Sequence, residues 1–161
     1  ILAAQNAGNT RDVVKLETMR ELIENGDMIV PRNYVRKYGF AARTINDNAD
    51  YLEGFLFRPE YNLLDTLRLY TAAFKYQDAL LAETMDNPLS DIVTEVKIPF
   101  YFLMGKYDCM TSPKAAQTYL DNLISQQEKE FVIFENSAHC PQFEERDVFY
   151  EWLCEKFLGE E

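Results

Sequence analysis

The sequence IPFYFLMGKYD occupies residues 98–108, and FVIFENSAH occupies residues 131–139. Each stretch contains an apolar run short enough for a buried strand, and each ends in a titratable side chain, Asp108 or His139. In open α/β sheets, chemistry is found beyond the carboxyl ends of the strands. The two stretches therefore predict paired strands that deliver an acid and the chain's only histidine to one edge of a sheet.

A helix is predicted between the two runs and another after the second. Ser112-Pro113 is a typical helix start, because serine caps the first turn and proline suits the first helical position. An apolar stripe over about Arg146 to Leu158 predicts the last helix. We expect strands at Ile98–Met104 and Phe131–Phe134 in β-α-β-α order, with the strands parallel because a helix connects them.

Residues 1–90 show helical patterning and no strand pattern. Ile1 to Ala7 resembles the last two turns of a helix stopped by Gly8, so we expect the chain to begin inside an element that starts upstream. Further helices are predicted over Thr10–Glu24 with Asn9 as cap, around Tyr34–Tyr38, over Asp47–Phe57, from Asn62 onward, and around Gln77–Thr84. The sequence therefore predicts that the chain divides into two segments. The first, residues 1–88, is helical, and the second, residues 89–161, is of the α/β type.

The composition excludes several classes of protein. Sixteen basic and 27 acidic residues give a net charge of −11, so a nucleic-acid backbone or an acidic membrane surface would repel the chain. No apolar run approaches the ~20 residues that a membrane helix needs. Three cysteines cannot all pair, no signal peptide is visible, and reduced thiols are typical of the cytoplasm, where we expect the protein to be.

The order of Asp108 and His139 matches the last two members of a Ser…Asp…His triad. A histidine that acts as a general base needs an acid on its other ring nitrogen, which fixes the tautomer and stabilises the imidazolium. The alternative is an aspartate in an ordinary strand-end turn and an unrelated surface histidine. Spacing alone does not decide between these two interpretations.

The flanking residues favour the triad. A strand, Gly-x-x-Asp, a Ser-Pro helix start, a second strand and Asn-Ser-Ala-His-x-Pro resemble the C-terminal quarter of the α/β-hydrolase fold. That resemblance implies that Asp108 is the catalytic acid and His139 the catalytic base. Ala7-Gly8-Asn9, Arg36-Lys37-Tyr38-Gly39 and Pro59-Glu60-Tyr61 look like the helical cap of a subgroup related to proline iminopeptidases.

The nucleophile of such an enzyme is missing. A nucleophile elbow needs Gly-x-Ser-x-Gly, yet no two of the six glycines are four positions apart. The resemblance implies that the serine and the oxyanion hole lie before residue 1, so the chain is the C-terminal half of a hydrolase and inactive alone. Cys109 or Cys140 could instead act as nucleophile, or form a metal site with Asp108 and His139, but neighbouring residues point apart and the spacing fits no common metal pattern.

Substrate contacts are less well indicated. Iminopeptidase-like enzymes hold a free amino group with cap carboxylates, for which Glu53, Glu60 and Asp65 are candidates by location only. A solvated face is the simpler interpretation of each. The sequence therefore assigns no substrate-binding residues.

Two functions remain open. The first is a serine hydrolase that transfers acyl groups, acting without a cofactor on short peptides with a free N-terminus or on esters. The second is a non-catalytic binding module that kept the fold. In either case the Ile98–Met104 strand needs a neighbour, so we expect a homodimer or a separate N-terminal fragment at that edge, unless the helices of residues 1–90 cover it.

Overall fold

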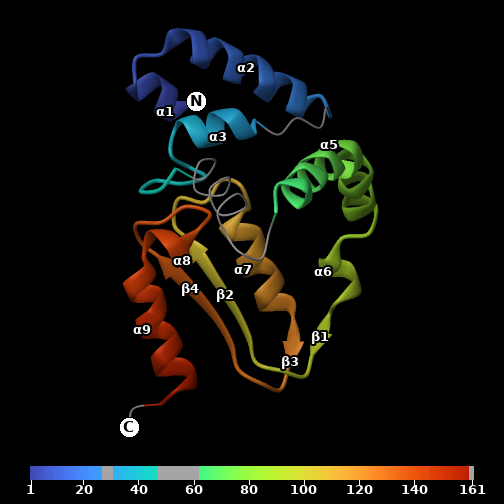
Figure 1. The fold of residues 1–161 in the computed structure, drawn as a ribbon, viewed down its shortest axis with the longest axis vertical. Coiled ribbons are helices and arrows are strands. Elements are labelled where there is room, and N and C mark those ends of the chain that lie inside the picture. Colours follow the sequence, from blue (N-terminus) through green and yellow to red (C-terminus); the bar gives the residue numbers. More distant parts are fainter. Residues whose placement is uncertain (27–30, 47–61, 160–161) are drawn as a thin grey trace.

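A computed structural model describes residues 1–26, 31–46 and 62–159 of the chain. It is a mixed α/β structure in which helices precede short parallel strands (Figure 1). In chain order the described elements are α1 (Leu2–Asn6), α2 (Thr10–Glu24), α3 (Arg32–Lys37), α5 (Leu63–Asp86), α6 (Leu89–Ile92), β1 (Glu95–Val96), β2 (Phe100–Gly105), α7 (Pro113–Asn122), β3 (Ile124–Ser125), β4 (Lys129–Phe134), α8 (Pro141–Glu144) and α9 (Arg146–Phe157). None of these helices is long and apolar enough to cross a membrane.

The strands form two parallel pairs. β2 pairs with β4 from Phe100↔Lys129 to Gly105↔Phe134, and β1 pairs with β3 starting at Glu95↔Ile124. Both pairings join residues that are 29 positions apart. Pro99 lies between β1 and β2 and has no N–H to donate, which favours an interruption there. Figure 1 shows both chain segments turning between the short pair and the long pair.

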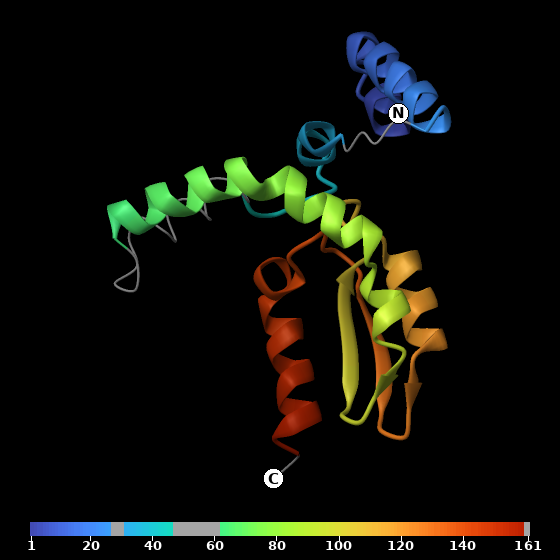
Figure 2. The same ribbon diagram turned by 90° about the vertical axis from the view of Figure 1, so that its right-hand side faces the viewer.

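Helices cover both faces of the longer pair (Figure 2). Side chains alternate between the faces of a strand. The ring centre of Phe102 lies 6.1 Å from that of Tyr119 in α7. The ring centre of its neighbour Tyr101 lies 5.5 Å from that of Trp152 in α9. The apolar side chains of β2 therefore pack against helices on both faces of the strand pair, as is usual for parallel strands.

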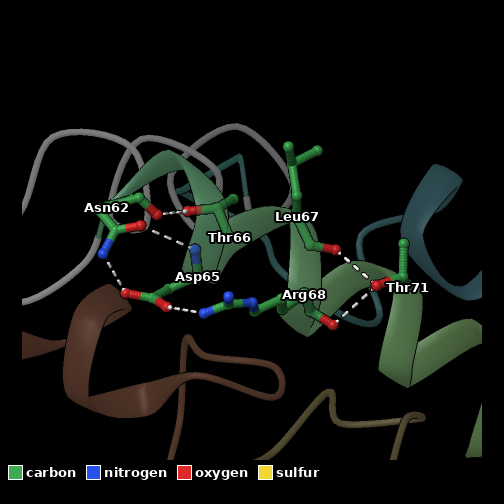
Figure 3. A network of polar contacts seen from close by, with 6 residues as sticks. All are labelled: Asn62, Asp65, Thr66, Leu67, Arg68 and Thr71. Carbon is green, nitrogen blue, oxygen red and sulfur yellow. Dashed lines mark hydrogen bonds and ion pairs between the residues drawn. The ribbon is translucent and has the colours of Figure 1, made fainter.

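The helix caps predicted at Asn9, Asn62 and Ser112 are confirmed. Asn9 accepts a hydrogen bond from the Asp12 backbone N–H at 3.1 Å at the start of α2, and Ser112 accepts one from Ala115 at 3.2 Å at the start of α7. Asn62 does the same for α5, where its side chain accepts from Asp65 at 3.0 Å (Figure 3). Each cap satisfies a backbone donor that the first turn leaves unpaired.

Other boundaries were wrong. The separate helix expected at Gln77–Thr84 is part of α5, because no glycine or proline breaks the chain between 63 and 86. The strands run over 100–105 and 129–134 instead of 98–104 and 131–134. Lys129 belongs to β4 because it pairs with Phe100, and its ammonium donates to the Leu120 carbonyl at 2.8 Å, a contact that no apolar pattern indicates. The short elements α6, α8, β1 and β3 were not predicted, and the helix expected at 47–57 lies outside the described residues.

Apolar surface is exposed on α5 in the described part of the molecule. The exposed large side chains are Leu63, Leu64, Leu67, Leu69, Tyr70, Tyr76, Leu80, Leu81 and Met85. In the described ranges, β2 has β4 as its strand neighbour on one edge and no strand on the other. Exposed apolar patches and open strand edges are features that proteins usually cover.

Gly105 allows the ends of the two strands to approach closely. A Cβ atom at this position would lie 1.9 Å from the Ala138 carbonyl oxygen and 2.5 Å from that of Ser137. Both are backbone atoms, so a side chain at residue 105 would push the loop after β4 away from β2.

Gly105→Ala should lower the free energy of unfolding by about 3 kcal/mol or more, because the clash is with backbone rather than with a flexible side chain. Gly8→Ala is the matched control. No atom lies within 4 Å of a Cβ there and φ is +66°, so that variant should lose only ~1–2 kcal/mol from left-handed strain. Urea denaturation of both variants measures the difference, and equal losses would contradict the steric argument.

Candidate acid–base site

The loops that follow β2 and β4 are joined directly beyond the strand ends. The Lys106 backbone N–H donates to the Phe134 carbonyl at 2.9 Å, and that of Tyr107 donates to the Ser137 carbonyl at 3.0 Å. These bonds bring the next residues of each loop together. The Asp108 Oδ2 and His139 Nδ1 atoms lie 3.0 Å apart, which confirms the proximity expected from the sequence.

The Asp108 carboxylate is buried, and both of its oxygen atoms accept hydrogen bonds. Only 6% of the residue is exposed. Its Oδ1 accepts from the backbone N–H groups of Met110 at 2.7 Å and Thr111 at 2.9 Å, and its Oδ2 accepts from the Thr111 hydroxyl at 2.6 Å. Burial acts to raise the pKa of Asp108, but the hydrogen bonds from Thr111 and His139 outweigh it and lower the pKa below its ordinary value.

His139 is oriented by this carboxylate. An ionised carboxylate can only accept, so Nδ1 carries the proton of the neutral ring and Nε2 offers a lone pair. No hydrogen bond reaches Nε2 from the residues that the structure describes, and 40% of the side chain is exposed. The arrangement can accept a proton at Nε2 from an incoming hydroxyl or water, with the resulting positive charge stabilised by Asp108.

Residues of the helical half also touch the site. The Phe40 carbonyl accepts from the Cys109 backbone N–H at 3.0 Å, and the Ala41 carbonyl accepts from that of His139 at 3.0 Å. The predicted boundary at 88/89 falls between α5 and α6, yet these bonds cross it. No pattern in the sequence indicates these bonds, because backbone pairing between residues 69 and 98 positions apart does not depend on side-chain identity. The part played by Thr111 was not predicted, although aspartate side chains in turns commonly accept hydrogen bonds from residues that follow them closely.

The cysteines do not suit the alternative roles. Cys109 is accessible, but partial burial and the charge of Asp108 raise the pKa of its thiol, which disfavours the reactive thiolate. Cys140 is buried at the start of α8. In the described ranges, no three His, Cys, Asp or Glu side chains form a group that could hold a metal ion.

The structure places one of the three candidate cap carboxylates. Asp65 accepts from Asn62 and pairs with Arg68 at 3.4 Å at the start of α5 (Figure 3), so it acts in helix capping. Glu53 and Glu60 lie outside the described residues. No substrate-binding role is assigned to these residues.

The lowered pKa of Asp108 predicts a specific pH dependence. A lowered folded-state pKa contributes stability that is complete above about pH 4 and is lost as the pH falls toward the folded-state pKa. Asp108→Asn should therefore cost more at pH 7 than at pH 3, as measured by urea denaturation. Asp78→Asn, on the exposed surface of α5, is the control and should have little effect at either pH. A loss for Asp108→Asn that does not change with pH would contradict the assigned hydrogen bonds.

Comparison with known proteins leaves the site to be interpreted from its own geometry. No protein-family model, no curated protein and no solved structure matches this chain. The relationship to α/β-hydrolases therefore stays a resemblance, carried by the residues around Asp108 and His139.

Proposed function

We propose that Asp108 and His139 are the acid and the base of a serine hydrolase of the α/β-hydrolase type. The observation that carries the proposal is their 3.0 Å contact, with Asp108 buried and His139 exposed. A surface histidine beside an ordinary turn aspartate would not require a carboxylate held by three further hydrogen bonds. The nucleophile in this proposal comes from sequence outside residues 1–161.

The proposed reaction is acyl transfer in two steps. A serine oxygen attacks the substrate carbonyl while His139 Nε2 takes its proton, and the imidazolium then protonates the leaving amine or alcohol as the carbon–heteroatom bond breaks. Water repeats the sequence on the acyl-enzyme and restores the serine. Asp108 stays ionised throughout, in keeping with its lowered pKa. Short peptides with a free N-terminus are the favoured substrates, followed by esters, and no cofactor takes part.

A non-catalytic binding module is the second candidate. It is favoured by one observation, the absence of Gly-x-Ser-x-Gly from the 161 residues. The sequence upstream of Ile1 distinguishes the two candidates. A strand ending in that motif supports the hydrolase, and unrelated sequence supports the module.

His139→Ala in a protein that includes the nucleophile should lower kcat by about 10⁴-fold or more, because triad members act as a unit. Aminoacyl p-nitroanilides and p-nitrophenyl esters serve as test substrates. Asp78→Asn is the control for general effects of substitution. Full activity of His139→Ala would overturn the proposed role.

Residues 1–161 alone should neither hydrolyse these substrates nor react with a fluorophosphonate probe, and labelling would reveal a nucleophile in this chain.

We also propose that the open edge of β2 is covered by another strand, either from a second copy of the chain or from a separate N-terminal fragment. The exposed apolar residues of α5 support this, since they too lack cover among the described elements. The assembled interface should bury more than ~1,000 Å².

Size-exclusion chromatography with light scattering tests the proposed assembly. Residues 1–161 alone should elute as a dimer, or should form a stable complex when the N-terminal fragment is added. A stable monomer near 18.8 kDa that binds no dye for exposed apolar surface would contradict the proposal and favour cover by the chain's own helices.

A further inference from the structure

Glu144 lies at the end of α8, five residues after His139, and has no role in the reaction described above. Its side chain is half-buried. The Oε2 atom accepts from the Ala138 backbone N–H at 2.7 Å. The Oε1 atom accepts from the backbone N–H groups of Arg43 and of Thr44, the latter at 2.8 Å. One carboxylate therefore binds three backbone donors from two segments about 100 positions apart.

These donors belong to the two segments that meet at the His139 backbone N–H. Ala138 directly precedes His139, and Arg43 and Thr44 follow closely after Ala41, whose carbonyl accepts from the His139 backbone N–H at 3.0 Å. The two successive peptide groups that precede the His139 Cα are thus held, 137–138 by Glu144 and 138–139 by Ala41. With its backbone held in this way, the ring meets an aspartate that is itself held by Thr111.

The chemistry of the contact requires a carboxylate. Three N–H donors converge on two oxygen atoms, and a carboxylate has acceptor sites for all of them. A glutamine has one acceptor oxygen, and its NH₂ group would face an N–H donor. Bonds to an ionised acceptor are also shorter and stronger than those between neutral groups.

We propose that Glu144 is a positioning residue for His139, joining residues 43–44 to Ala138 so that the imidazole stays against Asp108. Its effect on catalysis rests on the proposed hydrolase function, whereas its effect on His139 does not. The two can therefore be tested separately.

The single histidine makes the test direct, because [¹⁵N]histidine labelling gives one imidazole signal. The intact protein should show a downfield, slowly exchanging Nδ1 proton. Glu144→Gln should increase its exchange rate at least tenfold or remove the signal. It should also lower kcat by up to about 100-fold with little change in KM, because a misplaced base slows the proton transfer rather than substrate binding.

Glu135→Gln is the matched control. Glu135 lies in the same connection after β4, but it pairs with Lys106 at 2.6 Å instead of accepting a hydrogen bond from residues 43–44. This variant should keep the Nδ1 signal of the intact protein. Glu144→Asp retains the charge and lacks one methylene group, so it can reach only one of the two segments. It serves as the deciding variant if thermal unfolding shows that Glu144→Gln does not fold.

The outcomes separate the two proposals. Loss of the Nδ1 signal in a folded Glu144 variant supports the positioning role even if the intact protein hydrolyses nothing. In that case the hydrolase function fails and the positioning role stands. A folded Glu144 variant that keeps both the exchange rate and kcat of the intact protein overturns the positioning role.

Discussion

The contact between the chain at Gly105 and the chain at Ser137–Ala138 is the constraint on which the rest of the site depends. Without a side chain at Gly105, the loop after β4 can pass directly over the end of β2. The hydrogen bond from Tyr107 to Ser137 then fixes the two loops to each other. Asp108 and His139 are the next residues along these loops, so the backbone contact brings them near each other, and the side chains of Thr111 and Glu144 then hold each of them in place.

Several carboxylates around this site accept hydrogen bonds from backbone N–H groups. Asp108 and Glu144 each bind N–H groups of irregular loops, and Glu145 binds the Asn136 N–H at 2.9 Å and the Ser137 hydroxyl at 2.5 Å. Burial acts to raise the pKa of Glu145, but hydrogen bonds from Ser137 and Asn136 lower it overall. Part of the strong negative charge of the chain therefore stabilises loops that have no strand or helix to satisfy their donors.

Local signals in the sequence predicted what is local in the structure. Asn9, Asn62 and Ser112 cap helices because a cap depends only on the residues of one turn. The Asp108–His139 pairing could be inferred because each residue follows an apolar run. Long-range backbone bonds, such as that from His139 to Ala41, and the role of Lys129 at the end of α7 depend on tertiary geometry. No residue pattern within a window of the sequence carries that information.

The shared register of the two strand pairs has a consequence for how the length of this chain can vary. Residues 95–105 and 124–134 run in parallel with a constant offset of 29 through both sheets. Each of the two segments has three residues between its short and its long strand. An inserted or deleted residue in either linker would shift one sheet out of step with the other. Length changes in homologous sequences are therefore expected to be matched in both linkers or placed outside them.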